Sequence, residues 1–373
     1  MTDVPAAAAA AGPVLGPLVP RLAAPPRRFA WAELPTPVER APWLDDASST
    51  VWIKRDDRTS TIYGGGKVRK LQWVLANPPY DGPEPILSVG GTGSHHLLAL
   101  ARFLLPMQRE LHALVFEQPW TDHVQRNLAV LVSSGAKLWP ARTRIGLGWA
   151  WLAYHTWRRP PVRGTFMSAG ASTALGCFGF VEAGLELAAQ IEGGELPRPD
   201  VVYLTAGSAG SCAGLLLGLA LANVRTHLHL VSSVERWAFN RVMLGRMMGA
   251  AHRELLVRGL VDAPAGSAKD WLARAGITFT IDHAEVGGGY GSPTPTGVGA
   301  AQRAAVHGLV LETTYTAKCL AALHRIEAAY SGPPRNVLLW NTHGGNDLRE
   351  LVAPDWRERC PIVAPPRMSA GAP

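Results

Sequence analysis

The sequence predicts an α/β protein built on mostly parallel β-sheet with helices on both faces. Short apolar runs alternate with longer stretches of helical periodicity along the 373 residues, an alternation typical of parallel sheets. Glycine clusters follow three expected strands, at 90–91, 207–210 and 344–345. Because ligands of such sheets bind beyond the carboxyl ends of the strands, we expect these clusters to line a shared cleft.

The expected strands are short apolar runs bounded by turn residues. They lie at residues 51–53, 86–89, 111–116, 166–167, 201–204, 227–231, 277–281 and 337–340.

The expected helices fall between these runs. Residues 68–77 place Leu71, Val74 and Leu75 on one face, and Ser94 and Asp122 are expected to cap helices that run to about residues 105 and 133. Three more are expected: an aromatic-rich helix at 146–157, another at 175–190, and a very apolar one after Gly207.

Composition excludes several classes of protein. The chain is 47% hydrophobic and 17% charged, too apolar for general disorder and long enough for two domains. The four cysteines (177, 212, 319 and 360) are far apart, so we expect no disulfide framework, no zinc knuckle and a cytoplasmic location. The longest apolar stretch, 212–224, is too short to span a bilayer, and we expect no membrane partner.

The basic balance of the chain does not by itself indicate a polyanion partner. The formal charge is +7, but the basic residues are scattered, with short clusters at 27–28, 142–144 and 158–159, and we expect no nucleic-acid partner. Only six of the 36 basic residues are lysines, and Lys54, Lys67 and Lys70 lie close together. Lysine can lose its proton and act as a nucleophile, whereas arginine cannot.

Lys67 follows three glycines, Gly64 to Gly66. A glycine turn would present this lysine at a helix start, where partial positive charge helps to depress the pKa of the amine. A neutral lysine can form a Schiff base with an aldehyde or ketone. A solvated basic loop is the alternative, and a P-loop is excluded because Thr61 and Val68 break its pattern.

Residues 207–211, between an expected strand and an apolar helix, permit three interpretations. Their backbone N–H groups and the hydroxyls of Ser208 and Ser211 can cradle a phosphate. Ser208 is alternatively the nucleophile of a serine hydrolase, in a variant of G-x-S-x-G. That alternative needs an acid and a base, for which the chain offers Asp262 or Asp282 and His283 or His343. The third interpretation is a tight turn that packs a helix on a sheet.

Two further motifs supply candidate substrate contacts. Ser94, at an expected helix start, can hold a carboxylate with the help of free N–H groups. The adjacent His95 and His96 point in different directions on a helix, so we predict no metal site there. Tyr290, in a glycine-rich turn, is a candidate general acid or stacking wall, or else a packed core aromatic.

Together these stretches resemble the 1-aminocyclopropane-1-carboxylate deaminase/D-cysteine desulfhydrase family, pyridoxal-phosphate enzymes of the tryptophan-synthase-β-like fold (fold type II). The resemblance runs from about Leu34 to Asp347, and six family motifs occur in family order. They lie at 54–57 with 64–71, 93–96, 207–214, 289–294, 312–318 and 342–345.

The resemblance implies two open, mostly parallel sheets flanked by helices. A large cofactor-binding domain would comprise residues 31–70 and 170–362, and a small inserted α/β domain residues 71–169. Residues 1–30 and 363–373 would be flexible tails. The family resemblance also implies a homodimer.

The resemblance also implies a role for individual residues. Lys67 would carry pyridoxal 5'-phosphate as a Schiff base, and Lys54 would support the fold. Ser94 would take the substrate carboxylate, and Tyr290 and Tyr315 would face the reacting carbons. The other cofactor contacts would be His95 at the ring oxygen, His343 near the pyridine nitrogen, and Gly207, Ser208, Ala209, Gly210 and Ser211 at the phosphate.

Several positions depart from the family pattern. Gly66 and His95 stand where asparagine is expected, Gly93 replaces glutamine, and His343 replaces threonine. Thr316 stands where a deaminase typically has an acid, which disfavours opening of a cyclopropane ring. We therefore expect a pyridoxal-phosphate-dependent lyase or deaminase that acts on a small amino acid, D-amino acids included, by β-elimination or deamination. The alternatives are a serine hydrolase using Ser208 and a catalytically weakened cofactor-binding homologue.

Overall fold

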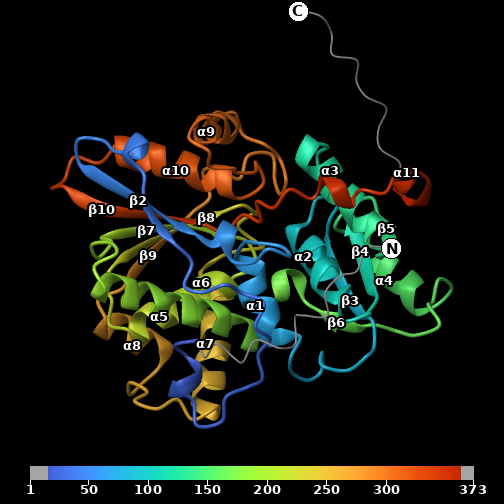
Figure 1. Cartoon of the computed structure of the whole chain (residues 1–373), viewed down its shortest axis with the longest axis horizontal. Coiled ribbons are helices and arrows are strands. Elements are labelled where there is room, and N and C mark those ends of the chain that lie inside the picture. The colour runs from blue at the N-terminus through green and yellow to red at the C-terminus, as the bar shows by residue number, and fades with distance from the viewer. Residues whose placement is uncertain (1–15, 363–373) are drawn as a thin grey trace, which may run out of the picture. The chain divides into compact units, whose positions relative to one another are not determined.

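The structure, a computed structural model, describes residues 16–362 and divides into two compact units (Figure 1). Of the described residues, the large unit comprises 16–82 together with Ser168–Asn346, and the small unit comprises Pro83–Met167 with 347–362. Both are α/β units with largely parallel sheets, which confirms the predicted fold class. No helix in the described range is both long and apolar enough to cross a membrane.

A six-stranded sheet forms the centre of the large unit. Its order is β1-β2-β10-β7-β8-β9, with β1 antiparallel to β2 and the other pairs parallel. The strands are β1 (Val38–Arg40), β2 (Ser49–Arg55), β7 (Val201–Ala206), β8 (His227–Ser232), β9 (Thr278–Asp282) and β10 (Arg335–Asn341).

Helices cover both faces of this sheet, as Figure 1 shows, with α9 and α10 on one side and α5 and α6 on the other. Alternate residues of one strand point to opposite faces. Val202 and Leu204 therefore join the apolar cluster of α5 and α6, while Val201 and Tyr203 join that of α10. The helices are α1 (Gly66–Val74), α5 (Phe178–Glu192), α6 (Gly210–Leu221), α7 (Arg241–Val257), α8 (Ala268–Arg274), α9 (Pro295–Val306) and α10 (Thr316–Ala328).

A four-stranded parallel sheet of order β5-β4-β3-β6 forms the centre of the small unit. The strands are β3 (Ile86–Gly91), β4 (Leu111–Phe116), β5 (Lys137–Ala141) and β6 (Thr165–Met167). The helices are α2 (His95–Leu104), α3 (Asp122–Ser133), α4 (Leu147–His155) and α11 (Trp356–Arg359). Thr121 caps α3 by accepting a hydrogen bond from Val124 N, a role that we had expected Asp122 to fill.

The N-terminal segment from residue 16 is packed against the large unit, which corrects the expected flexible tail of residues 1–30. Leu18 and Leu22 are buried, and Leu22 forms a β-bridge with Leu260. Arg28 donates to the buried carboxylate of Glu182 at 2.8 Å. Prolines break this segment into short turns, and single leucines fill gaps in the core. Residues 1–15 and the expected tail 363–373 lie outside the described range.

The boundaries of the two units also differ from those expected. The predicted small domain of residues 71–169 begins inside α1, whereas the structure keeps α1 and the chain up to Gly82 in the large unit. Residues from 347 onward return to the small unit, where Ala353 N donates to Ser133 Oγ.

A buried ionic network ties α1 to its neighbours. The guanidinium of Arg69 donates to both carboxylate oxygens of Asp56 and of Glu186, at 2.8–3.0 Å. The Lys54 amine donates to Glu186 at 2.6 Å, and all four side chains are at most 5% exposed. Burial alone would raise the pKa of Glu186, but the charges and hydrogen bonds of Arg69 and Lys54 lower it to about 2.

Replacing the charge of Glu186, by Glu186→Gln, should lower the free energy of unfolding by about 3–5 kcal/mol, because Arg69 and Lys54 lose a buried partner. The lowered pKa means that the contribution of Glu186 is present above about pH 4.5 and is lost as the pH falls toward 2. Urea unfolding at neutral pH measures the change. Asp347→Asn, which removes the exposed partner of Arg349, is the control and should change little. Equal effects of the two substitutions would contradict the network's role.

Candidate active site

Lys67 lies in the first turn of α1, directly after a glycine turn. Gly65 has φ +92°, in the left-handed region, and a Cβ there would lie 2.7 Å from Thr342 O. Gly66 N donates to the same carbonyl at 3.1 Å. Only glycine permits this close approach, which anchors the start of α1 against the loop after β10.

Phe180 accounts for the glycine at position 66, where the family pattern has asparagine. A Cβ at this position would lie 2.8 Å from the ring of Phe180, which is fully buried in α5. The larger asparagine would have to displace a core aromatic ring.

The amines of Lys67 and Lys70 both have lowered pKa values. Burial lowers the pKa of Lys67, and the nearby carboxylate of Glu312 opposes this shift. Burial and the charge of Lys67 lower the pKa of Lys70 to about 7. Lys67 is half-buried, and its lowered pKa favours the neutral amine, which is the nucleophilic form.

Residues 207–211 form the turn between β7 and α6. Ala209 has φ +65°, and Gly210 N donates to Ser208 O at 2.9 Å, which bends the chain sharply into the helix. The turn directs the first N–H groups of α6 toward the space beyond β7, and such groups attract anions. Because Ala209 replaces a family glycine at a left-handed position, this turn carries backbone strain.

Lys70 and Ser172 complete the turn, and our sequence analysis had not assigned either residue to the site. The Lys70 amine donates to Ser172 Oγ at 2.8 Å, and Ser172 Oγ lies 2.8 Å from Ser208 Oγ. A Cβ at Gly210 would lie 2.7 Å from both Lys70 Nζ and Ser172 Oγ. Lys70 was detectable in the sequence, because it is one helical turn after Lys67, but Ser172 comes from a distant segment that carries no motif.

Tyr290 and Tyr315 are brought together in the large unit. Tyr315 Oη donates to Tyr290 Oη at 2.8 Å, and a Cβ at Gly207 would lie 3.5 Å from the Tyr315 ring. The Tyr290 backbone N–H donates to the carboxylate of Glu235 at 3.3 Å. The tyrosine pair therefore lies beside the turn after β7.

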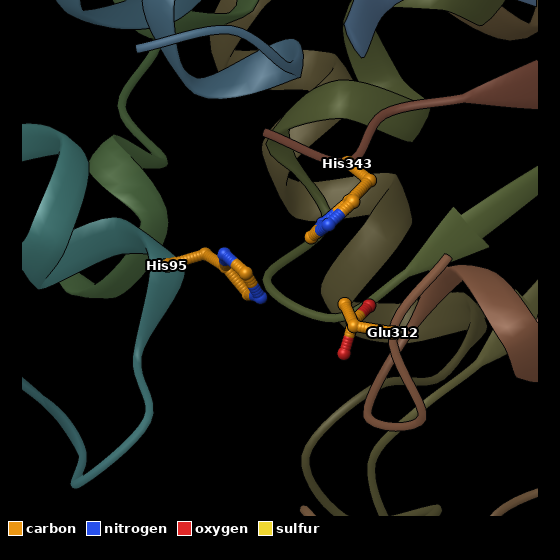
Figure 2. Close-up of side chains that lie close together, drawn as sticks. All are labelled: His95, Glu312 and His343. Atoms are coloured by element: carbon orange, nitrogen blue, oxygen red, sulfur yellow. The ribbon is translucent and has the colours of Figure 1, made fainter. Parts of the chain in front are cut away.

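Glu312 fixes the loop that carries Tyr315, and the sequence analysis had not singled it out as a site residue. Its buried carboxylate accepts hydrogen bonds from the N–H groups of Thr314, Tyr315 and Thr316 at 2.7–2.9 Å, which caps the start of α10. Figure 2 shows this carboxylate with the imidazole of His343, from the loop after β10. A ring nitrogen of His343 and a Glu312 oxygen lie within 4.8 Å of each other.

Ser94 and His95 belong to the small unit. Ser94 caps α2, and its Oγ accepts a hydrogen bond from Leu97 N at 3.3 Å. His95, also drawn in Figure 2, stacks on His123 with ring centroids 5.6 Å apart. His96 turns inward, with Nε2 2.9 Å from Ser88 Oγ, which confirms that the adjacent histidines diverge.

Val124 accounts for the glycine at position 93, where the family pattern has glutamine. A Cβ there would lie 2.7 Å from the Val124 side chain of α3. The backbone of Gly93 is held by Gln118, which accepts from its N–H at 3.1 Å, and by Asn127, which donates to its carbonyl at 2.9 Å.

The three expected glycine-rich strand ends divide between the two units. Those at 207–210 and 344–345 follow the neighbouring strands β7 and β10 of the large sheet, whereas Gly90 and Gly91 end β3 of the small sheet. These strand ends therefore belong to the two sheets that the family resemblance implies, and the shared cleft stays a prediction.

The turn at 207–211 fits a phosphate group. A Cβ at Gly210 would meet the Lys70 amine and the Ser172 hydroxyl, so a cation and a hydrogen-bonding group both adjoin this position. Lys67 lies one helical turn before Lys70, and its charge acts on the Lys70 amine of this cradle. The hydroxyl of Ser208 bonds to Ser172 of this cradle, while Asp282, a candidate acid of the hydrolase alternative, forms an ion pair with Arg325.

The chain belongs to the family of pyridoxal-phosphate dependent enzymes, whose family model matches residues 31–342. Its cofactor is therefore pyridoxal phosphate, as the resemblance of the motifs implied. D-Cysteine desulfhydrases of Salmonella paratyphi B and Salmonella dublin are 31% identical to it over 308 residues, covering 79% of this chain and 88% of each relative. The family and these relatives make the chain a lyase or deaminase, and they do not favour the hydrolase alternative.

Solved structures support the fold. A homologue of ACC deaminase aligns with a TM-score of 0.70 at 21% identity and covers 90% of this chain and 97% of its own. A fungal L-serine ammonia-lyase from Rhizomucor miehei aligns with a TM-score of 0.52 at 16% identity, covering 87% of this chain and 97% of its own. Together they confirm the predicted fold type.

Lys70 should make anion binding in the cradle depend on pH. Because its pKa is about 7, the amine is charged below that pH, so the cofactor-free protein should bind sulfate more tightly at about pH 6 than at about pH 8. Calorimetric titration with sulfate, which keeps its charge over this range, measures the difference. Lys70→Met should weaken binding roughly tenfold at the lower pH and flatten the pH dependence. Lys269→Met, at an exposed lysine, is the control; the same loss there would contradict the assignment.

Proposed function

We propose that the enzyme acts on a small amino acid, with D-cysteine as the first candidate, by β-elimination. The products would be sulfide, ammonia and the 2-oxo acid. The observation that carries this proposal is the convergence of a lysine of lowered pKa, an anion-binding turn and a hydrogen-bonded tyrosine pair in the large unit. The desulfhydrase relatives support the choice of D-cysteine.

Pyridoxal phosphate, when bound, supplies an electron sink for negative charge at the substrate Cα. We propose that Lys67 holds the cofactor and then moves the proton at Cα. Burial suits both tasks, because it lowers the pKa of the Lys67 amine and so favours the neutral form, which is the form that accepts a proton. The cradle of Lys70, Ser172 and residues 207–211 would hold the phosphate.

The tyrosine pair is suited to protonate the leaving group. Tyr315 donates to Tyr290, so the two hydroxyls form one hydrogen-bonded pair. Glu312 fixes the backbone of Tyr315 through the cap of α10, which limits motion of the ring. We propose that a proton from this pair reaches the substrate sulfur as the carbon–sulfur bond breaks.

Ser94 would bind the substrate carboxylate. It lies at the start of α2, whose first N–H groups and partial positive charge favour an anion. His343, within 4.8 Å of Glu312, would lie near the pyridine nitrogen, and His95 would flank the ring oxygen.

Thr316 supports elimination over ring opening. It stands where a deaminase typically has an acid, and its hydroxyl accepts a hydrogen bond from Glu312 N at 3.2 Å. The side chain is thus engaged in the cap of α10.

The cysteines and the family resemblance support two further proposals. We propose a cytoplasmic enzyme, because all four cysteines are free and three of them are buried. We propose a homodimer on the family resemblance. Light scattering of the purified protein should then give twice the chain mass of 39.9 kDa.

Lys67→Ala should abolish turnover of D-cysteine and the visible absorbance of the bound cofactor, because the covalent link is lost. In the unaltered protein, borohydride should fix the cofactor on the peptide that contains Lys67, as mass spectrometry would show. Lys269→Ala should retain both properties. Cofactor fixed on Lys70 instead would overturn the assignment. Cofactor colour without turnover of any amino acid would favour the catalytically weakened homologue.

Tyr315→Phe should slow elimination from D-cysteine by about a hundredfold or more in kcat, the usual contribution of a general acid. β-Chloro-D-alanine releases chloride, which needs no proton, so its kcat should fall far less. Steady-state assays of the 2-oxo acid measure both substrates. Tyr330→Phe, at a surface tyrosine bonded to Pro333 O, is the matched control. An equal loss with both substrates would assign Tyr315 to positioning and would contradict the acid role.

A further inference from the structure

The small unit exposes an unusually apolar surface around α4. We call it the α4 surface and define it by the exposed large hydrophobic side chains between residues 145 and 166. Ile145 is 91% exposed, Trp149 70% and Trp157 66%. Its members are Ile145, Trp149, Trp151, Leu152, Trp157, Val162 and Phe166.

The helix α4 is apolar on its outer face as well as on its inner one. The inner face buries only Ala150, Ala153 and Tyr154, which pack on the small sheet. Trp149 and Leu152, three residues apart, lie on the opposite side. A helix that is apolar all round is normally covered, so the outer face of α4 has the composition of a contact surface.

Arginines flank the α4 surface along the sequence. Arg142, Arg158, Arg159 and Arg163 are exposed, and Arg144 is half-buried above the ring of Phe116. The sequence contains no Asp or Glu between residues 123 and 181. The α4 surface is apolar and aromatic, and its own segment carries arginines but no carboxylates. Such a surface complements a partner with an anionic exterior over a hydrocarbon interior.

Local contacts hold the arginines and tryptophans in place. Arg158 N donates to Ala153 O at 2.8 Å, and Arg158 O accepts from Trp139 Nε1 at 3.2 Å, which anchors the loop after α4. Trp151 packs edge-on against Phe166 at 5.3 Å between ring centroids, so β6 contributes to the same surface. Figure 1 shows α4 and this loop, in green, at the outer edge of the small sheet.

We propose that the α4 surface binds reversibly to membranes that contain anionic lipids. Tryptophan prefers the boundary between headgroups and acyl chains, and clustered arginines are attracted to anionic headgroups. The nine-residue α4 is too short to cross a bilayer of about 30 Å, so its contact with a membrane is confined to that boundary.

Two other occupants fit the α4 surface less well. A second copy docked by a two-fold axis would set these arginines against one another. A single-stranded nucleic acid would stack on the tryptophans, but Ile145, Leu152 and Val162 offer aliphatic contacts that suit acyl chains.

Sedimentation of the full-length holoenzyme with vesicles tests the proposal. Vesicles of equal parts phosphatidylcholine and phosphatidylglycerol should bind it at low salt, binding should weaken as salt rises, and phosphatidylcholine alone should bind little. Replacing Arg158, Arg159 and Arg163 together by Gln should weaken binding on the order of a hundredfold. Trp149→Ala with Trp157→Ala should also weaken it and should remove the shift of tryptophan emission caused by vesicles.

Matched controls come from exposed residues of the large unit. Trp237→Ala and the triple replacement of Arg246, Arg253 and Arg303 by Gln should leave vesicle binding unchanged, and all variants should retain the cofactor absorbance. Equal binding to neutral and anionic vesicles, or equal loss in the controls, would overturn the proposal. A shift to smaller mass in Trp149→Ala with Trp157→Ala would instead identify an interface between copies. Binding of single-stranded DNA through these residues without vesicle binding would identify a nucleic-acid site.

Discussion

The guanidinium of Arg69 is the constraint on which the large unit depends. It joins the end of β2, through Asp56, to α5, through Glu186, and it belongs to the same helix as Lys67. A buried guanidinium without partners would be very costly, so these elements must assemble together. Lys54 completes the network from β2, which agrees with the structural role expected for it. The consequence for chemistry is indirect: the helix that carries Lys67 and Lys70 is held rigidly against the sheet.

Close contacts at three glycines hold the loops of the site against α1 and against one another. Gly65 meets the loop after β10, Gly210 meets the amine of Lys70, and Gly207 lies beside the ring of Tyr315. The contacts at Gly65 and Gly210 are too close for a Cβ, whereas a Cβ at Gly207 would meet the Tyr315 ring at ordinary contact distance. The site is therefore a set of glycine turns that bring distant strand ends together, and a few polar side chains supply the chemistry. Phe180 and Val124 show why two family side chains are missing: core atoms occupy their places.

The small unit contains a buried polar helix start and an exposed apolar helix. Ser94 caps α2 and is buried, whereas α4 leaves tryptophans and aliphatic side chains exposed. The scattered arginines of the sequence become a group here because the loop after α4 folds back onto the end of that helix. Our expectation of no membrane partner considered only segments that could span a bilayer, and it did not address a surface contact of this kind.

The sequence by itself determined the fold class and most strands, and it supplied the candidate residues of the cofactor site, because apolar runs, glycine turns and motif order are local signals. The strand 111–116 and the helix 122–133 have the predicted bounds, while α7 to α10 went unpredicted because their periodicity is mixed with arginine, glycine and alanine. β5 was missed because Pro140 interrupts it, and the edge of a sheet tolerates that proline. Only the tertiary structure decided the bond of Lys70 to Ser172 and the bond of Arg69 to Glu186. Each of these hydrogen bonds joins segments more than a hundred residues apart, and no local pattern in the sequence encodes such a contact.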